Sequence, residues 1–174
     1  ILRQAFKQAC GIAASQFVMG EDIYTALDQS QSLLSQGDSC SFDMLGEASL
    51  SRQDSTRYLD AYRDAIIAVG QCDSFNRCLL KPSVSIKLSA LHPRFEALQA
   101  ERCLPELLDA LTQLIEPARQ YGVPLTIDAE ESERLEPSLQ LFERLLGGPA
   151  QGWGELGLAV QAYSKRALPQ LCWL

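Results

Sequence analysis

The sequence has few residues that bind metals: it contains one histidine, His92, and its six cysteines are scattered with no C-x-x-C pair. Structural zinc sites need such ligands at short, paired spacings. A zinc site is therefore not expected. We interpret the cysteines as reduced, mostly buried thiols in a reducing compartment, because an isolated cysteine behaves as a small hydrophobic residue.

Basic clusters and long apolar runs are also missing. The formal net charge is -7 and Lys and Arg form no run, whereas nucleic-acid binding needs clustered positive charge. We expect no nucleic-acid partner for this segment. No apolar stretch reaches the roughly 18 to 20 residues that span a bilayer, and Ile1 opens the chain without Met, a basic n-region or a cleavage site. We therefore expect a cytoplasmic protein, or a piece cut from a longer one.

Alternating helical and extended patterns are what the sequence does contain, with 47% hydrophobic residues to build a core. Residues 1–38 are predicted to form a helical segment, whose second helix ends near Gly37. In residues 39–174, four short apolar runs alternate with amphipathic segments. The runs lie at 40–45, 84–88, 125–128 and 156–161. Strands that alternate with helices in this way favour β-α-β units and a parallel sheet.

Helix boundaries between these runs are marked by particular residues. Ser51 followed by Asp54 is typical of a helix start, and Gly70 is expected to close that helix. The next helix is predicted to end at Gly122, and part of the acidic segment 128–131 is expected to complement a helix dipole. A last helix is predicted to carry an apolar stripe of Leu135, Leu139, Phe142 and Leu146.

Each apolar run ends in one polar side chain, and these are Asp43, Lys87, Asp128 and Gln161. In a parallel β/α barrel all strands open their carboxyl ends onto one face, where the active sites of such barrels lie. A doubly wound sheet would place its ligand at a switch point, usually after a glycine-rich first turn. Residues 44–48 do not form such a turn, so the barrel is the preferred architecture.

An ammonium and two carboxylates gathered in this way would shift one another's pKa values and could hold a charged small molecule. Other interpretations stay open. Lys87 and Asp128 could form a purely structural ion pair, and Gln161 could simply satisfy backbone groups, although its amide also suits the edge of a flat heteroaromatic ring. His92, which precedes Pro93, is interpreted as structural or solvated rather than catalytic.

Four segments carry these residues: SFDMLGEA at 41–48, SIKLSALHPR at 85–94, IDAEE at 127–131 and VQAYSKR at 160–166. In order and spacing they resemble the proline dehydrogenase domain of bifunctional proline utilisation proteins. The resemblance covers the chain from about Phe17 to its end, and the second and third segments are the most specific.

This resemblance implies a (β/α)8 barrel of the TIM type that holds FAD, oxidises L-proline to 1-pyrroline-5-carboxylate and passes electrons to a membrane quinone. It implies that Lys87 contacts the proline carboxylate and that Asp128 lies beside the reacting flavin as a catalytic residue. Ala129 and Gln161 would touch the flavin. Asp43 matches the acid that ends the first strand, and we expect it to shape the mouth of the barrel.

The family's domain continues beyond a fourth strand, whereas this sequence ends at Leu174. We therefore expect residues 1–174 alone to be inactive, with an open sheet edge and an uncovered core face, and we expect an oligomer. One rival hypothesis is a non-catalytic piece that assembles through its open edges. Another is a flavin barrel of the methylenetetrahydrofolate reductase type, although the segments around Lys87 and Asp128 favour proline.

Overall fold

The structure is a computed structural model that describes residues 3, 4, 6, 11, 18–45, 48–73, 75 and 81–174. The helix predicted at the start of the chain lies largely outside these residues. The second predicted helix is α2, Ile23–Ser35, and strands alternate with helices after it. The chain therefore has the α/β organisation that the sequence predicts.

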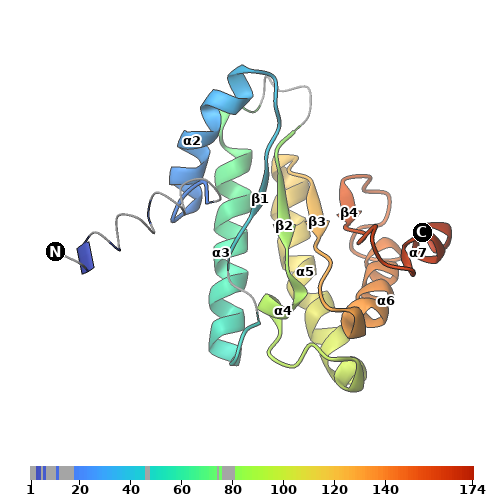
Figure 1. The fold of residues 1–174 in the computed structure, drawn as a ribbon. Helices are drawn as coiled ribbons and strands as arrows, with labels where there is room; N and C mark the ends of the chain where they lie inside the picture. The colour runs from blue at the N-terminus through green and yellow to red at the C-terminus, as the bar shows by residue number, and fades with distance from the viewer. Residues whose placement is uncertain are drawn as a thin grey trace.

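Four strands form one parallel sheet in the order β1-β2-β3-β4 (Figure 1). Their bounds are Ser41–Asp43 for β1, Ser83–Ile86 for β2, Leu125–Ile127 for β3 and Leu156–Leu158 for β4. All four are shorter than the apolar runs that predicted them, and β4 ends three residues before Gln161. The parallel, sequential order confirms the predicted sheet.

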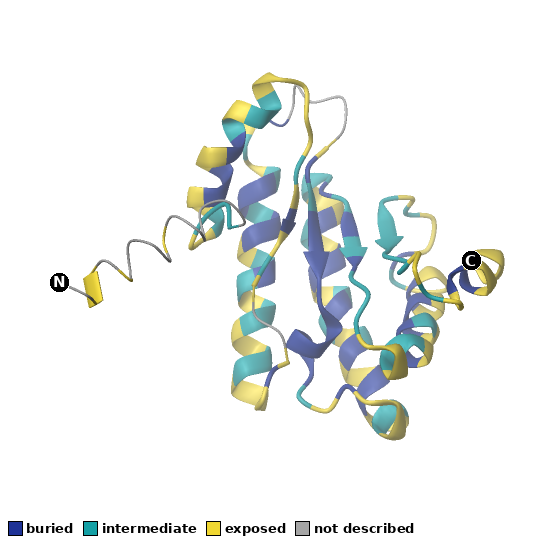
Figure 2. Ribbon diagram, viewed as in Figure 1, coloured by how far each residue is buried: buried dark blue, intermediate teal, exposed yellow. Residues whose placement is uncertain are grey.

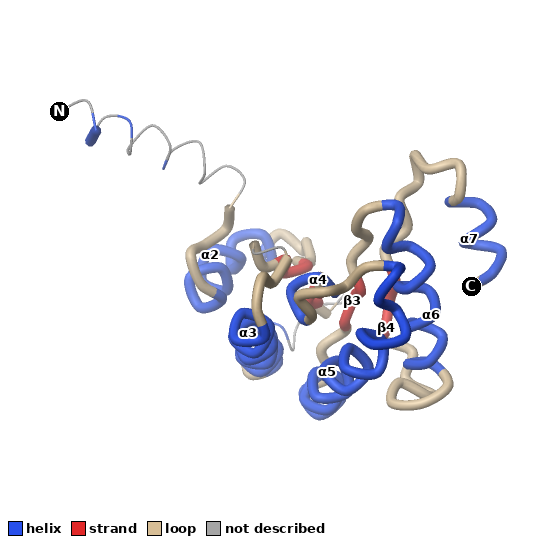
Figure 3. Tube along the Cα trace, turned by 90° about the horizontal axis from the view of Figure 1, so that it is seen from below, coloured by secondary structure: helices blue, strands red, loops and turns tan. Residues whose placement is uncertain are grey.

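The helices α3 (Arg52–Gly70), α5 (Ala100–Tyr121) and α6 (Leu135–Leu146), which connect successive strands, lie on one side of the sheet (Figures 1 and 3). No helix in the described ranges has both the length and the apolar character needed to cross a membrane. The remaining elements are short: α4 (Leu88–Leu91), the 3-10 helices η2 (Ala97–Gln99) and η3 (Ser132–Arg134), and α7 (Ala167–Trp173).

Helix ends follow the sequence signals closely. Ser51 caps α3, because its hydroxyl oxygen accepts a hydrogen bond from the backbone N–H of Asp54 at 3.1 Å. Gly122 closes α5 with a φ of 66°, and Gly37 follows α2 with a φ of 91°. Both values lie in the left-handed region that glycine adopts without steric cost. These boundaries are therefore set locally.

The core lies between the sheet and its helices, where dark blue marks the buried residues in Figure 2. Strand side chains alternate, so that every second residue faces α3, α5 or α6. The buried strand residues on this side are all apolar. They are Phe42, Val84, Ile86, Leu125 and Ile127.

On the opposite face of the sheet, which we call the open face, the side chains are small or polar. Its residues, read from the strand registers, are Ser41, Asp43, Ser83, Ser85, Thr126 and Gly157. The hydroxyls of Ser83 and Ser41 hydrogen-bond across two strands at 2.9 Å. The expected uncovered face is therefore small and polar rather than apolar, because alternation directs the apolar half of each strand to the helices.

Two other expectations about burial need correction. In α6 the predicted stripe is correct at Phe142, which is buried, but Leu146 is 43% exposed. The other buried residues of the helix are Pro137, Ser138, Leu141 and Leu145. The buried face is therefore centred one residue earlier than the predicted stripe, where α6 packs against α5. Among the described thiols only Cys103 is buried, so the expectation of mostly buried cysteines is wrong for them. Two of the six cysteines lie outside the described residues.

Gly70 provides a test of the packing between α3 and α5. A Cβ at this position would lie 2.9 Å from Cγ of Tyr121 and 3.2 Å from Cγ2 of Val123. We expect Gly70→Ala to lower the free energy of unfolding by about 1 to 3 kcal/mol, because the overlap outweighs the gain in helix propensity. Calorimetry of the full-length protein should show a lower transition temperature for this domain.

The matched control is Gly154→Ala, since a Cβ at Gly154 would meet no atom within 4 Å. This variant should unfold at the wild-type temperature. Equal transition temperatures for the Gly70 and Gly154 variants would contradict the close packing.

Candidate functional site

Three charged residues meet where the first three strands end, and we call them the strand-end cluster: Asp43, Lys87 and Asp128. Asp43 is the last residue of β1, while Lys87 and Asp128 directly follow β2 and β3. The register pairs Asp43 with Ser85, and Lys87 lies two residues further along on the same face. Ile86 pairs with Ile127, so the next residues are Lys87 and Asp128. Strand register thus brings the three side chains together.

The ammonium of Lys87 bridges the two carboxylates. Its Nζ lies 3.0 Å from Oδ2 of Asp128 and makes a shorter contact with Oδ1 of Asp43. The Lys87 side chain is only 9% exposed, while those of Asp43 and Asp128 are 46% and 28% exposed. The two carboxylates of the cluster are therefore accessible to solvent, whereas the ammonium group of Lys87 is buried. The predicted meeting of these residues is confirmed.

The pKa of Lys87 lies above its ordinary value. Burial by itself would lower it, but hydrogen bonds and charge attraction from Asp43 and Asp128 together outweigh burial. Lys87 is therefore an ammonium at neutral pH. One lysine and two aspartates give the cluster a formal net charge of one negative unit.

Tyr62 supports the cluster from α3 and was not predicted as a site residue. Its hydroxyl oxygen accepts the backbone N–H of Lys87 at 3.0 Å. Burial raises the pKa of Tyr62 to about 12, so the phenol stays neutral. In the sequence Tyr62 reads as one more member of an apolar stripe. The available signal was chemical, because a buried tyrosine hydroxyl requires a hydrogen-bond partner.

The two residues predicted to touch a flavin lie beside the cluster. The backbone N–H of Ala129 donates to Oδ1 of Asp128 at 2.9 Å. Gln161 forms no hydrogen bond with the three charged residues, and its Nε2 instead donates to the backbone oxygen of Glu130 at 3.2 Å. Gln161 does satisfy a backbone group, as one interpretation of the sequence held. Its amide oxygen and second N–H have no partner among the described residues.

Glu130 is the second residue that the sequence did not single out. Its side chain is only 8% exposed, and its Oε1 accepts the backbone N–H of Ser89 at 2.9 Å. Its Oε2 lies 2.5 Å from Nη1 of Arg134, and Arg134 also pairs with Glu131 at 3.0 Å. One residue of the acidic segment thus accepts a hydrogen bond from a helix N-terminus, as predicted. The helix is α4, which belongs to the preceding β/α unit and not to the unit of Glu130.

His92 lies away from the strand-end cluster, in a contact between the loop after α4 and helix α5. Its Nδ1 accepts the backbone N–H of Arg94 at 3.1 Å, and its Nε2 lies 3.3 Å from Oε2 of Glu106. Burial lowers the pKa of His92, against the attraction of Glu106. The neutral ring therefore holds the loop in place, which agrees with a structural role.

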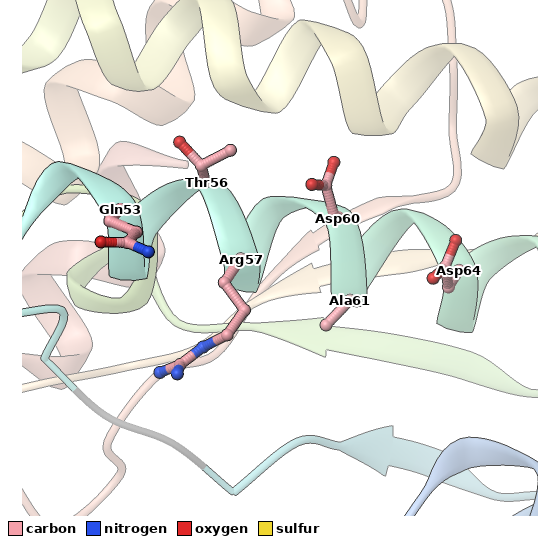
Figure 4. A pocket seen from close by; sticks show the side chains of 6 residues that line it. All are labelled: Gln53, Thr56, Arg57, Asp60, Ala61 and Asp64. Atoms are coloured by element: carbon pink, nitrogen blue, oxygen red, sulfur yellow. The ribbon is translucent and has the colours of Figure 1, made fainter.

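A separate depression lies along α3 (Figure 4). All of its lining residues belong to that one helix, whereas the strand-end cluster is built by the ends of three strands. Within the described ranges no group of acidic, cysteine or histidine side chains is arranged to hold a metal ion. The residues that line the depression are Gln53, Thr56, Arg57, Asp60, Ala61 and Asp64.

The strand-end cluster suits a small ligand that carries charges of both signs. A half-buried carboxylate attracts a cationic group, and the Lys87 ammonium offers its remaining N–H to an anionic one. The neighbouring residues of the open face have small side chains, so no bulky group of β1 or β2 stands beside the cluster. The geometry therefore fits an amino acid better than a neutral or polyanionic ligand.

Comparison with known proteins gives a consistent result. The model of the family described as proline dehydrogenase matches residues 26–174. The sequence is 42% identical over 167 residues to the bifunctional protein PutA of Escherichia coli strain K12. The aligned region covers 95% of this chain and 13% of that protein.

Solved structures agree with the sequence comparison. A mutant of proline utilization A from Bradyrhizobium japonicum is 42% identical, with a TM-score of 0.75 over 90% of this chain and 16% of that one. Proline utilization A from Bdellovibrio bacteriovorus, inactivated by N-propargylglycine, is 22% identical with a TM-score of 0.89, over 98% of this chain and 19% of that one. The second likeness shows a shared fold. This chain spans less than a fifth of the length of each of these relatives.

Proposed function

The chain belongs to the proline dehydrogenase family, and on that premise we propose that the full-length protein oxidises L-proline to 1-pyrroline-5-carboxylate. The observation that carries the proposal is the buried Lys87 ammonium held between Asp43 and Asp128. It provides one positive and one net negative region within the span of a small amino acid. Proline presents a carboxylate and a secondary ammonium with matching charges.

In this proposal the chain's residues bind and orient the substrate. Lys87 donates a charge-assisted hydrogen bond to the proline carboxylate. Asp128, 28% exposed and fixed by its bonds to Lys87 and Ala129, lies at the reacting end as the catalytic residue. Asp43 shapes the mouth and holds Lys87 from the other side. Hydride transfer depends on such placement, because misplacement of the reacting atoms lowers the rate steeply.

The cofactor that the family implies is FAD, and the donor set beside the cluster fits a flavin. Gln161 is half-buried and keeps its amide oxygen and one N–H for a ligand, a pattern that matches the edge of a flat heteroaromatic ring. Ala129 places backbone next to the cluster without a bulky side chain. When bound, FAD would accept the hydride. Gln161 and Ala129 would hold the ring, within a (β/α)8 barrel of which this chain supplies four β/α units.

We further propose a cytoplasmic protein that meets the inner membrane peripherally, passes electrons to a quinone and forms oligomers. These proposals rest on the resemblance to the family. The rival hypothesis of a non-catalytic piece has less support, because the open face carries small polar side chains rather than an apolar surface for assembly. The folate-type flavin barrel also has less support, because the matched family is described as proline dehydrogenase.

The test uses the purified full-length protein. We expect a flavin absorbance spectrum, bleaching of that spectrum by L-proline under anaerobic conditions, and turnover with a dye or quinone acceptor. Residues 1–174 alone should give neither stoichiometric flavin nor turnover, because β1 and β4 each have a single neighbouring strand in the described sheet.

Two results would overturn the proposal. A full-length protein that binds flavin yet is not reduced by proline would exclude this substrate. Reduction by methylenetetrahydrofolate in place of proline would support the folate-type barrel.

A further inference from the structure

Helix α4 begins at the site, and its sequence does not provide a cap. Lys87 occupies the N-cap position and makes no side-chain capping bond, because an ammonium has no acceptor. The first N–H groups of a helix have no partner within the helix and must be satisfied elsewhere when buried. All four residues of α4 are buried. The partners of these N–H groups therefore decide how Lys87 is held.

Two buried side chains from other elements supply the caps. The Tyr62 hydroxyl accepts the N–H of Lys87 at 3.0 Å, and Oε1 of Glu130 accepts the N–H of Ser89 at 2.9 Å. Tyr62 comes from α3 and Glu130 from the segment after β3.

Glu130 connects the ends of all four strands. Its backbone oxygen accepts Nε2 of Gln161, which follows β4. Through Ser89 the connection reaches the segment after β1, because Ser89 accepts the N–H of Ser49 at its backbone oxygen and the N–H of Ala48 at its hydroxyl, at 2.9 and 3.3 Å. Glu130 thus links the segments after β2, β3 and β4 directly, through its buried side chain to Ser89 and its backbone oxygen to Gln161, and the segment after β1 through Ser89.

We propose that Glu130 is a positioning residue for Lys87: by capping α4 it sets where the ammonium meets the proline carboxylate. The inference rests on the proposed function and adds a residue to it. Glu130 does not contact the ammonium itself. It fixes the peptide two residues further on, and Tyr62 fixes the peptide of Lys87, so that the start of the Lys87 side chain is held from both sides.

The neighbouring acid provides a matched control. Glu131 also pairs with Arg134, at 3.0 Å, but its side chain is 60% exposed and forms no hydrogen bond with the described residues of α4. Three variants at Glu130 separate the roles of its carboxylate. Glu130→Gln keeps an acceptor for Ser89 while Glu131 still pairs Arg134, Glu130→Asp keeps the charge but is one methylene shorter, and Glu130→Ala removes both.

We expect Glu130→Ala and Glu130→Asp to lower kcat/KM for proline about 10-fold or more, mainly through KM, because each loses the bond to Ser89. Glu130→Gln and Glu131→Ala should stay within about threefold of the wild type. All are measured in the full-length protein with steady-state kinetics and flavin content. If Glu130→Ala does not fold, the comparison of Glu130→Asp with Glu130→Gln still tests the proposal. Equal kcat/KM values for those two variants would overturn it.

A double-mutant cycle tests whether Glu130 acts through Lys87. In a Lys87→Met background, Glu130→Asp should change kcat/KM by less than about twofold, because no ammonium remains to be positioned. A 10-fold loss in both backgrounds would show a merely structural role and overturn the inference. If the wild-type protein does not oxidise proline at all, the proposed function fails instead, so the two failures are distinguishable.

Discussion

Replacing Lys87 with methionine in the full-length protein is expected to raise the KM for proline by about 10-fold to 150-fold. The range corresponds to the loss of one charge-assisted hydrogen bond, worth about 1.5 to 3 kcal/mol. Methionine keeps most of the apolar stem, so packing should change little. Loss of the ammonium also leaves Asp43 and Asp128 without the cation between them, and the two acids then repel the substrate carboxylate. Steady-state kinetics with a dye acceptor measures the effect.

Flavin content should stay close to that of the wild type, because Lys87 lies in the substrate position of the proposed site. Lys81→Met is the matched control: Lys81 precedes the same strand at its opposite end and pairs with Glu155 at 3.7 Å. This variant should keep the wild-type KM. An unchanged KM together with lost FAD in Lys87→Met would assign Lys87 to the cofactor.

Asp128→Asn should lower the rate of flavin reduction by proline about 10-fold or more, while fold and flavin occupancy are kept. The substitution preserves shape and removes a charge that is 28% exposed and bonded to Lys87 at 3.0 Å. A charge in a shielded site couples to a reacting ring more strongly than it would in water. Stopped-flow absorbance at equal flavin occupancy measures the reduction rate directly.

Asp109→Asn, at an exposed position of α5, is the control and should reduce at the wild-type rate. A wild-type rate in Asp128→Asn would leave Asp128 with a scaffold role. A different pattern is expected if Lys87 and Asp128 form only a structural ion pair. The double variant would then be no less active than the less active single variant, and both single variants would be less stable than the wild type.

Strand ends and helix boundaries could be predicted from the sequence because the signals for them are local. The caps at Ser51 and Gly122 depend on residues within one turn. Asp43, Lys87 and Asp128 follow from the strand pattern alone, because parallel strands place their carboxyl ends on one edge. Once the sheet is inferred, the meeting of these three side chains follows from its register.

Tyr62 and Glu130 could not be found in this way because their partners are distant backbone groups. A helical stripe does not distinguish a tyrosine that only packs from one whose hydroxyl holds the peptide of Lys87. The acidic segment likewise does not show which helix N-terminus each carboxylate serves. The buried face of α6 was similarly ambiguous until its packing against α5 was known.

The contacts around Lys87 also determine when this lysine can acquire its native surroundings during folding. Its partners are 44 residues before it at Asp43 and 25 residues before it at Tyr62, while the cap on Ser89 comes from Glu130, 41 residues after Ser89. Contacts between residues so distant in sequence form late, because the intervening loops must first be closed. A chain that has packed only β1, α3 and β2 still lacks Asp128 and Glu130. The native surroundings of Lys87 are therefore complete only when the ends of β1, β2 and β3 have come together.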